Sequence, residues 1–381
     1  MLADFGEYLS GFCNSSPVTT RNYRLPQPTS GPVEVDGSFG EGGGQILRTA
    51  VCFSMVFGVP VHVTKIRAGR KVPGLRPQHA ATIKILGKIC SADVSGAEVG
   101  STELRFSPGA VETTRDFFDL GTAASIPLVL QAVIPAVSLM GNSYDLDLVG
   151  GTDVPWSPTS DYLEAVVAPA MKAVGIGFSF RVERRGYYPN GGGRASVHID
   201  PCERVEPMHL ASMRGVEAAR SGVVSLASRC GKLPVSVAER QARAAVASLR
   251  ARGVEVSRKE VTLEDSVSPG SSILLSQVGD GCYLGGDSIG ERGKMAEVVG
   301  REASDSFLAA YVSGARADVH LADMLGPVLC LSDSPSALLI PYVTQHLRTS
   351  LHVAAQFTAA SHEFEQRGKA ALLSISPVRA K

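Results

Sequence analysis

The chain has 381 residues, of which 37 are basic and 37 acidic, so its formal net charge is zero. A chain of this length can bury a large core and exceeds one typical domain, so two domains are expected. The balanced charge argues against wholesale electrostatic capture of long duplex DNA, although it leaves room for a local basic cleft.

Strand-like and helix-like segments alternate along the chain. Alternating or β-rich patterns predict strands at 61–66, 103–106, 144–149 and 178–184. Apolar residues at helical spacing predict helices at 79–89, 125–139 and 161–174. This recurrence suggests an internally repeated α/β domain, although generic α/β alternation would give a similar pattern.

A change in motif density follows Pro201 and lasts until Pro269. The interval holds an Ala/Arg-rich helical pattern at 237–252 with strand-like segments on either side, and a further helix is predicted at 295–310. The flanking strand-like segments are 222–226 and 254–261. The sequence by itself therefore indicates an α/β protein with an insert.

The cysteines and the chain's start bear on the compartment. An odd, unclustered set of cysteines favours free thiols in a reducing compartment over a zinc site or a disulfide framework; the seven stand at positions 13, 52, 90, 202, 230, 282 and 330. The apolar segment 125–140 is broken by Pro127 and Pro135, and no run reaches membrane-spanning length. Residues 1–32 are rich in Ser, Pro, Thr and Asn, which predicts a flexible N-terminal extension and not a secretory signal. We expect a cytoplasmic protein without a membrane partner; if the protein is eukaryotic, a nuclear location is the alternative.

The most informative stretch is Gly40-Glu-Gly-Gly-Gly-Gln-Ile-Leu-Arg48, with four glycines within five residues. Such a loop lets the backbone approach a ligand, and the apolar spacing after it predicts a helix whose N-terminus can receive an anion. Glu41 stands in the loop, where a cation bridging two phosphates would need an oxygen ligand. Arginine's planar fork suits phosphate oxygens, and four arginines follow closely, namely Arg48, Arg67, Arg70 and Arg76. A glycine-rich loop alone is usually a turn, but the combination predicts a phosphate or nucleotide site.

This run, with Ile66-Arg-Ala-Gly-Arg70 and Pro73-Gly-Leu-Arg-Pro-Gln-His79, resembles the signature of the RNA 3'-terminal phosphate cyclase family. The resemblance extends from about Val33 to about Phe357, with further matching segments in the family's order: Ser95-Gly-Ala-Glu-Val-Gly-Ser-Thr-Glu103, Gly150-Gly-Thr-Asp-Val-Pro155, Arg185-Gly-Tyr-Tyr-Pro-Asn-Gly-Gly-Gly193 and Leu284-Gly-Gly-Asp-Ser-Ile-Gly-Glu-Arg-Gly293.

The resemblance implies an α/β (α+β) fold with a large catalytic domain of three βα-type repeats and a smaller inserted α/β domain. The large domain would comprise 33–203 and 301–370, and the insert 204–300. Because every implied site residue lies outside the insert, the large domain is expected to hold the ATP pocket by itself.

His346 lies in Thr344-Gln-His-Leu-Arg-Thr349, where the family has the His-x-x-Thr motif of its nucleophile. Taken alone, a histidine here would be an ordinary polar residue. A neutral imidazole is nevertheless a usable nucleophile near neutral pH, and its phosphoramidate is easily displaced. The resemblance implies that His346 carries the covalent AMP.

The remaining site residues also come from the resemblance. Glu41 would hold Mg²⁺ or Mn²⁺, and the phosphates of ATP or of the RNA end would be held by Arg48, Arg67 and Arg70. Gln78 and His79 would line the site. Adenine would lie between Pro158 and His320, with Asp323 beside it. The alternatives are a solvated basic face for the arginines and, for His320, a surface residue or a neighbour of a helix N-cap.

Three departures from the family pattern affect adenine binding. Met324 stands where many members have Gln, one residue is missing before Pro327 relative to the family pattern, and Ser350 stands where bacterial-type members have Asn.

The implied activity is that of an RNA 3'-terminal-phosphate cyclase (ATP), a ligase of nucleotidyltransferase type. It converts an RNA 3'-phosphate to a 2',3'-cyclic phosphate through histidine–AMP and RNA(3')pp(5')A intermediates. The expected partners are ATP and single-stranded 3'-phosphorylated RNA ends, and the protein is expected to be a monomer or homodimer. One alternative is a non-catalytic protein of ribosome or pre-rRNA assembly on the same fold; that branch lacks the histidine, so His346, Glu41 and the Arg-Ala-Gly-Arg arginines argue against it. A small-molecule transferase such as an enolpyruvyl transferase is a third reading, by fold analogy alone.

Overall fold

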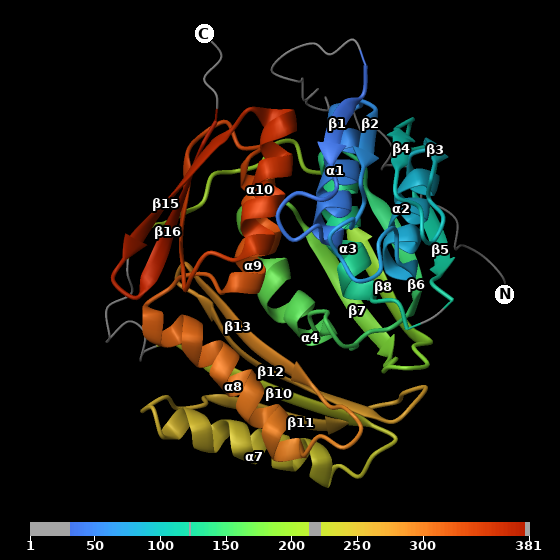
Figure 1. Cartoon of the computed structure of the whole chain (residues 1–381). Coiled ribbons are helices and arrows are strands. Elements are labelled where there is room, and N and C mark those ends of the chain that lie inside the picture. Colours follow the sequence, from blue (N-terminus) through green and yellow to red (C-terminus); the bar gives the residue numbers. More distant parts are fainter. Residues whose placement is uncertain (1–30, 122, 213–221, 378–381) are drawn as a thin grey trace, which may run out of the picture.

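The computed structural model describes residues 31–121, 123–212 and 222–377, and these residues form four four-stranded sheets (Figure 1). The expected extension at 1–32 lies outside the described residues except for its last two. The helices that the structure describes include none that combines the length and apolar character needed to span a bilayer. The six cysteines in the described part of the chain are buried and form no disulfide.

Three of the four sheets, here called the first, second and third in chain order, share one topology. In each, the first two strands along the chain are parallel, the last two are antiparallel, and the spatial order is first, second, fourth, third. In the first two repeats a helix follows each of the first two strands directly. This arrangement confirms the α/β fold class and its three βα-type repeats.

The first repeat carries the glycine-rich loop between its first strand and first helix. Its elements are β1 (Val33–Asp36), α1 (Gly44–Phe57), β2 (Val61–Thr64), α2 (Pro77–Ile89), β3 (Asp93–Ser95) and β4 (Leu104–Ser107). The second repeat has β5 (Arg115–Asp119), α3 (Ile126–Leu139), β6 (Tyr144–Gly150), α4 (Ser160–Tyr162), the π-helix η1 (Leu163–Val167), α5 (Ala168–Ala173), β7 (Phe178–Arg184) and β8 (Gly193–Ile199).

The third repeat is interrupted along the chain. It consists of β9 (His209–Leu210), α9 (Val319–Leu329), β14 (Ser336–Ile340), α10 (Gln345–Thr358), β15 (Ser361–Arg367) and β16 (Ala370–Ser376). Between β9 and α9 the chain builds the fourth sheet from β10 (Val224–Gly231), β11 (Arg258–Leu263), β12 (Gly270–Gly279) and β13 (Cys282–Ile289), together with α7 (Ser236–Arg250) and α8 (Ala296–Ser313).

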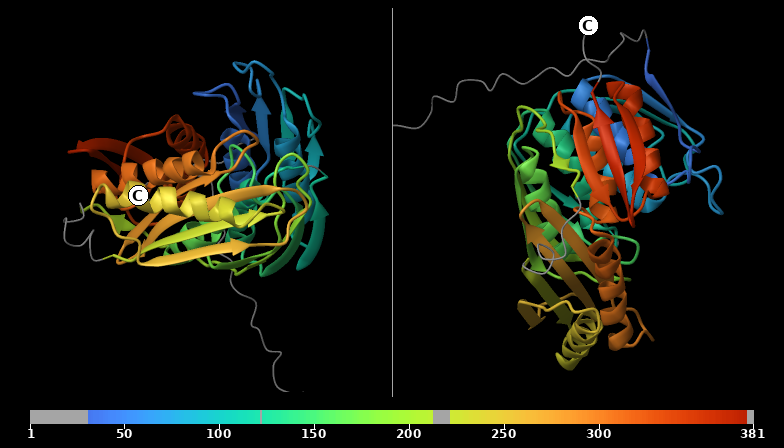
Figure 2. Two further views of the ribbon diagram at one scale, coloured as in Figure 1. Left: turned by 90° about the horizontal axis from the view of Figure 1, so that it is seen from below. Right: turned by 90° about the vertical axis from the view of Figure 1, so that its left-hand side faces the viewer.

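The fourth sheet lies at one end of the molecule, with α7 and α8 packed side by side against it (Figures 1 and 2). It has a separate hydrophobic cluster that includes Val224, Leu249, Ile273 and Phe307. The predicted boundaries at 204 and 300 stay a prediction; β9 pairs with β14 of the third sheet, and α8 runs on to Ser313.

The main core is built around α1 and α3. Helix α1 packs against α2, α3 and α10, and all of α3 is buried except Leu128 and Gln131. A helix that is apolar on every side belongs in the middle of a core, and α3 matches that rule. Leu128 and Gln131 both face the cleft described below.

Some predicted bounds differ from the structure. The strand expected at 254–261 begins only at Arg258. The Val254 amide instead donates to the Leu249 carbonyl at the end of α7, and the Val254 side chain packs into the second core cluster. The helix expected at 161–174 is present, but its middle is the π-helix η1.

Candidate active site

A cleft of about 1430 Å³ lies where the N-terminal ends of α1, α2, α9 and α10 meet the loop after β6 and the end of β13. All of the predicted site residues line it: Glu41, Arg48, Arg67, Arg70, Gln78, His79, Pro158, His320, Asp323 and His346. Residues far apart in the sequence are therefore brought to one cavity.

The glycine-rich loop opens α1, as predicted, with Gly43 as its N-cap. Gly40 has a φ of 58°, and a Cβ there would lie 2.6 Å from Thr349 Oγ1 of α10. A Cβ on Gly44 would overlap the imidazole of His79. The loop thus needs glycine both for its left-handed backbone and for its close approach to two helices.

One carboxylate oxygen joins the candidate nucleophile to an arginine. Glu41 Oε2 lies 3.2 Å from His346 Nε2 and 3.0 Å from Arg70 Nη2. His346 sits in the first turn of α10, which Thr344 caps by accepting a hydrogen bond from the Leu347 amide. The cap fixes where the helix starts and hence where the imidazole lies.

The arginines give the cleft an excess of positive charge. Arg48 forms no ion pair with any described residue, and its burial lowers the pKa of its guanidinium to about 10. Burial, followed by the charges of Arg70 and Arg76, also lowers the pKa of Arg67. Cations that burial and mutual repulsion destabilise favour an anionic ligand, because such a ligand supplies the missing opposite charge.

His79 is held neutral beside these arginines. Burial, followed by the positive charges of Arg48, Arg67 and Arg76, lowers its pKa to about 3. Its Nδ1 lies 3.2 Å from the Arg76 amide, which donates to it. His79 therefore orients the start of α2 and adds no charge at neutral pH.

Gln78 has its amide occupied by the protein. Its Oε1 accepts from the Ser125 amide at 2.6 Å, and its Nε2 donates to the Ser125 carbonyl at 3.1 Å. Ser125 is the N-cap of α3. Gln78 thus lines the cleft and also holds the start of α3 against α2.

The predicted adenine residues come from α9, which carries His320 and Asp323, and from the loop after β6, which carries Pro158. His320 follows the N-cap Asp318 of α9, is exposed, and meets the ring of Tyr162 edge to face at 6.3 Å. Asp323 accepts a short hydrogen bond from Thr344, and burial raises its pKa to about 6. Asp323 therefore links the start of α10, and with it His346, to α9. Met324 and Ser350, which depart from the family pattern, also line the cleft.

The fourth sheet supplies part of the wall, so the expectation that the large domain lines the pocket alone is wrong. Asp287 of β13 accepts from the Thr159 amide at 2.7 Å, next to Pro158, and burial raises its pKa. Further lining residues from the same segment are Ser288, Ile289, Glu291 and Lys294. Sequence reasoning gave Asp287 no role, although it lies in a segment that matches the family.

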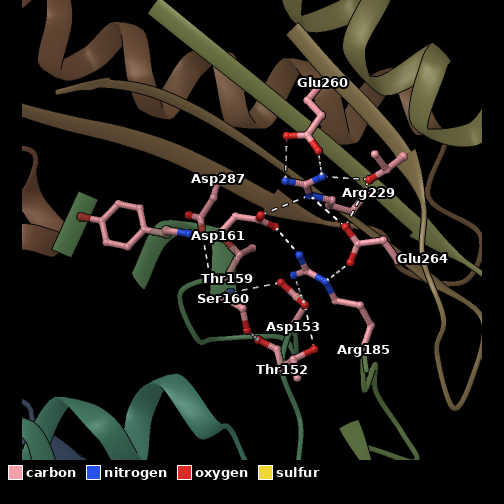
Figure 3. A network of polar contacts seen from close by, with 12 residues as sticks. Thr152, Asp153, Thr159, Ser160, Asp161, Arg185, Arg229, Glu260, Glu264 and Asp287 are labelled. Atoms are coloured by element: carbon pink, nitrogen blue, oxygen red, sulfur yellow. Dashed lines mark hydrogen bonds and ion pairs between the residues drawn. The ribbon is translucent and has the colours of Figure 1, made fainter. Parts of the chain in front are cut away.

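A buried polar network anchors this wall (Figure 3). Arg185 contacts Asp153 at 2.9 Å, Asp161 at 3.0 Å and Glu264 at 2.6 Å. Arg229 of β10 contacts Asp161 at 3.1 Å. The network joins the second repeat to the fourth sheet.

The fold and the cleft define a class: an α/β repeat protein with a cationic cleft in which an imidazole faces a carboxylate. A family model described as RNA 3'-terminal phosphate cyclase matches residues 39–364. The chain belongs to the RNA 3'-terminal phosphate cyclase family.

Proteins named RNA 3'-terminal phosphate cyclase are similar over nearly their whole length. That of Thermococcus kodakarensis is 43% identical, covering 90% of this chain and 98% of the relative. That of Caldivirga maquilingensis is 39% identical, covering 91% and 99%. The solved enolpyruvyl transferase NikO from Streptomyces tendae is 11% identical with a TM-score of 0.29, covering 92% of this chain and 48% of that one, which is too weak to carry an argument.

Proposed function

We propose that this protein uses ATP to convert the 3'-terminal phosphate of single-stranded RNA into a 2',3'-cyclic phosphate. The observation that carries the proposal is the meeting of His346 with Glu41 and Arg70, 3.2 and 3.0 Å from one carboxylate oxygen, in a cleft lined by arginines. The relatives' shared name supports the same reaction.

In the first step His346 attacks the α-phosphorus of ATP. A phosphorus–nitrogen bond forms, the bond from that phosphorus to the bridging oxygen breaks, and pyrophosphate leaves. Arg48, Arg67 and Arg70 would stabilise the charge on the phosphates, since guanidinium groups bind phosphate oxygens in pairs of charge-assisted hydrogen bonds. Glu41 would hold the imidazole toward the phosphate.

In the second step an oxygen of the RNA 3'-phosphate attacks the phosphorus of the histidine-bound AMP. The phosphorus–nitrogen bond breaks, His346 is released, and RNA(3')pp(5')A forms. In the third step the vicinal 2'-hydroxyl loses its proton and its oxygen attacks the RNA phosphorus. The bond from that phosphorus to the oxygen that bridges it to AMP breaks, which gives the cyclic phosphate and free AMP. The attacking hydroxyl belongs to the substrate, so the protein mainly positions the end.

The residues present fit a divalent cation bound together with the phosphates. Mg²⁺ at such sites commonly takes one or two carboxylates and completes its shell with phosphate oxygens and water. Glu41 supplies a carboxylate whose Oε1 accepts no hydrogen bond from the described residues, and no group of three or more His, Cys, Asp or Glu there could hold a metal by itself. When bound, the cation would neutralise the departing pyrophosphate.

The test is to incubate the protein with ATP, Mg²⁺ and a short 3'-phosphorylated RNA whose terminal phosphate is labelled. Cyclisation makes the label resistant to a phosphomonoesterase, because a cyclic diester is not a substrate for it. We expect resistance with the wild type and none with His346→Ala. A wild type that leaves the label fully sensitive would refute the proposal and favour the non-catalytic alternative.

A further inference from the structure

Trp156, the only tryptophan of the chain, is displayed at the cleft. Trp156 is 95% exposed and lines the cleft together with the predicted site residues. A single exposed apolar residue is ordinary on a protein surface, so exposure alone carries little. The backbone conformation at Trp156 and the contacts of the neighbouring residues are stronger evidence for a role.

The backbone at Trp156 is left-handed, with a φ of 62°. A bulky residue rarely adopts this conformation, and it persists only where the surrounding structure imposes it. The flanks of the loop are fixed. Asp153 is held by Arg185 and accepts from the Ser160 amide at 3.2 Å, and the Thr159 amide donates to Asp287. A rigid loop thus holds an indole out into solvent.

A second exposed ring comes from the neighbouring loop. The Thr152 amide donates to the Gly186 carbonyl at 2.9 Å, and Asp153 and Tyr187 form an isolated parallel bridge, so the two loops run side by side. Tyr187 is buried, whereas Tyr188 is 62% exposed and lines the cleft. Two rings on adjacent fixed loops therefore border the same cavity.

We propose that Trp156 and Tyr188 form a stacking platform for the last bases of the RNA strand; this inference rests on the proposed function. Every base has a flat face, so stacking on aromatic rings holds single strands without reading their sequence. The arginines of the cleft that form no ion pair with a described residue, among them the exposed Arg76, suit the strand's phosphates.

The position of Trp156 favours an RNA base over the adenine of ATP as the group that stacks on it. Of the predicted adenine residues His320 is exposed, but Pro158 and Asp323 are half-buried, and Asp323 accepts a hydrogen bond from Thr344, the cap of the helix that carries His346. A nucleotide transferred to His346 must lie at that depth. The indole, being almost fully exposed, marks the mouth of the cleft, where the rest of the RNA has to pass.

The first test compares variants of Trp156. Trp156→Gly suits the left-handed backbone and removes the ring, so it should fold and raise the KM for RNA about 5- to 150-fold, the usual effect of losing one stacked base. Trp156→Phe keeps a ring and should restore most of the affinity. Phe117→Ala, which removes a 55% exposed ring outside the cleft lining, is the matched control. An unchanged KM in Trp156→Gly would overturn the inference.

The second test uses the fluorescence of the sole tryptophan. Titration with a 3'-phosphorylated single-stranded oligoribonucleotide should change the emission of Trp156 saturably, and ATP alone should change it little. No response to RNA would overturn the inference, as would a Trp156→Gly variant that loses self-labelling by ATP along with RNA affinity. A wild type that ATP never labels would instead refute the proposed function, so the two failures are distinguishable.

Discussion

Replacing Arg185 with methionine should destabilise the junction between the second repeat and the fourth sheet. The guanidinium is only 5% exposed and touches Asp153, Asp161 and Glu264, whose side chains are 0%, 9% and 27% exposed. Methionine keeps much of the packing of the stem. It leaves Asp161 and Glu264 with Arg229 as their cation, and Asp153 without an ion-pair partner among the described residues.

The size of the effect follows from the burial. Removing one partner of a buried ionic network costs about 3–5 kcal/mol, because the remaining charges stay desolvated. Unfolding entropy of about 2.1 cal/mol/K per residue gives roughly 0.8 kcal/mol/K for 381 residues. The midpoint of thermal unfolding should therefore fall by roughly 4–6 °C.

The stability lost in Arg185→Met should depend on pH in a definite direction. Burial raises the pKa of Asp161, and Arg185 opposes that rise. Without Arg185 the pKa of Asp161 should rise further, so folding then favours the protonated acid more strongly. The stability that such a protonated group contributes to the folded state is lost as the pH rises. The unfolding free energy of Arg185→Met should accordingly be closer to that of the wild type at pH 5 than at pH 8.

Arg204→Met is the matched control. Arg204 pairs with Glu206 at 2.6 Å, but the two side chains are 67% and 43% exposed, so its loss should cost less than about 1 kcal/mol. Thermal and urea unfolding of both variants provide the measurement. Equal losses in the two variants, or a loss in Arg185→Met that grows as pH falls, would refute the reasoning.

Three other predictions concern the cleft. Gly44→Ala should weaken self-labelling by ATP and cost about 1–3 kcal/mol of stability, because its Cβ would overlap His79; Gly69→Ala, with open space around it, should do neither. Glu41→Gln should lower the labelling rate by about 10²-fold or more by removing the charge that faces the cation and His346, and normal labelling across a Mg²⁺ titration would contradict this. Burial raises the pKa of Asp323 to about 6, so folding favours its protonated form; Asp323→Asn should raise the unfolding free energy by about 1–3 kcal/mol at pH 8, and the gain should vanish below pH 4. A gain of the same size at both pH values would show that the charge is not its cause.

Local pattern and family resemblance were sufficient for the elements around the loop. The glycine run before an apolar helical pattern predicted the start of α1. The His-x-x-Thr motif singled out His346, and the structure then places it in the first turn of α10, 3.2 Å from Glu41. These features depend on short stretches of chain, each carrying its own signal.

The residues that sequence reasoning missed depend on contacts between distant segments. Asp287 acquires its place from a hydrogen bond to Thr159, 128 residues earlier. Trp156 is notable only because the fold turns it outward at the cleft. The hairpin of β12 and β13 gave no alternating signal, because β12 is buried on both faces from Ser271 to Gln277. Burial of this kind is a property of the assembled sheets, and one strand's sequence does not reveal it.

The most direct test of the central claim is labelling of the protein with ATP that carries the label in its α-phosphate, in the presence of Mg²⁺. A phosphoramidate is labile in acid and stable in base, and the wild type should acquire such a label. His346→Ala should acquire none. His352 lies on the same helix as His346, and its ring stacks on that of Phe39 with 3.7 Å between the ring centroids. His352→Ala should still be labelled. Labelling that survives in His346→Ala, or that is lost only in His352→Ala, would contradict the assignment of His346 as the nucleophile.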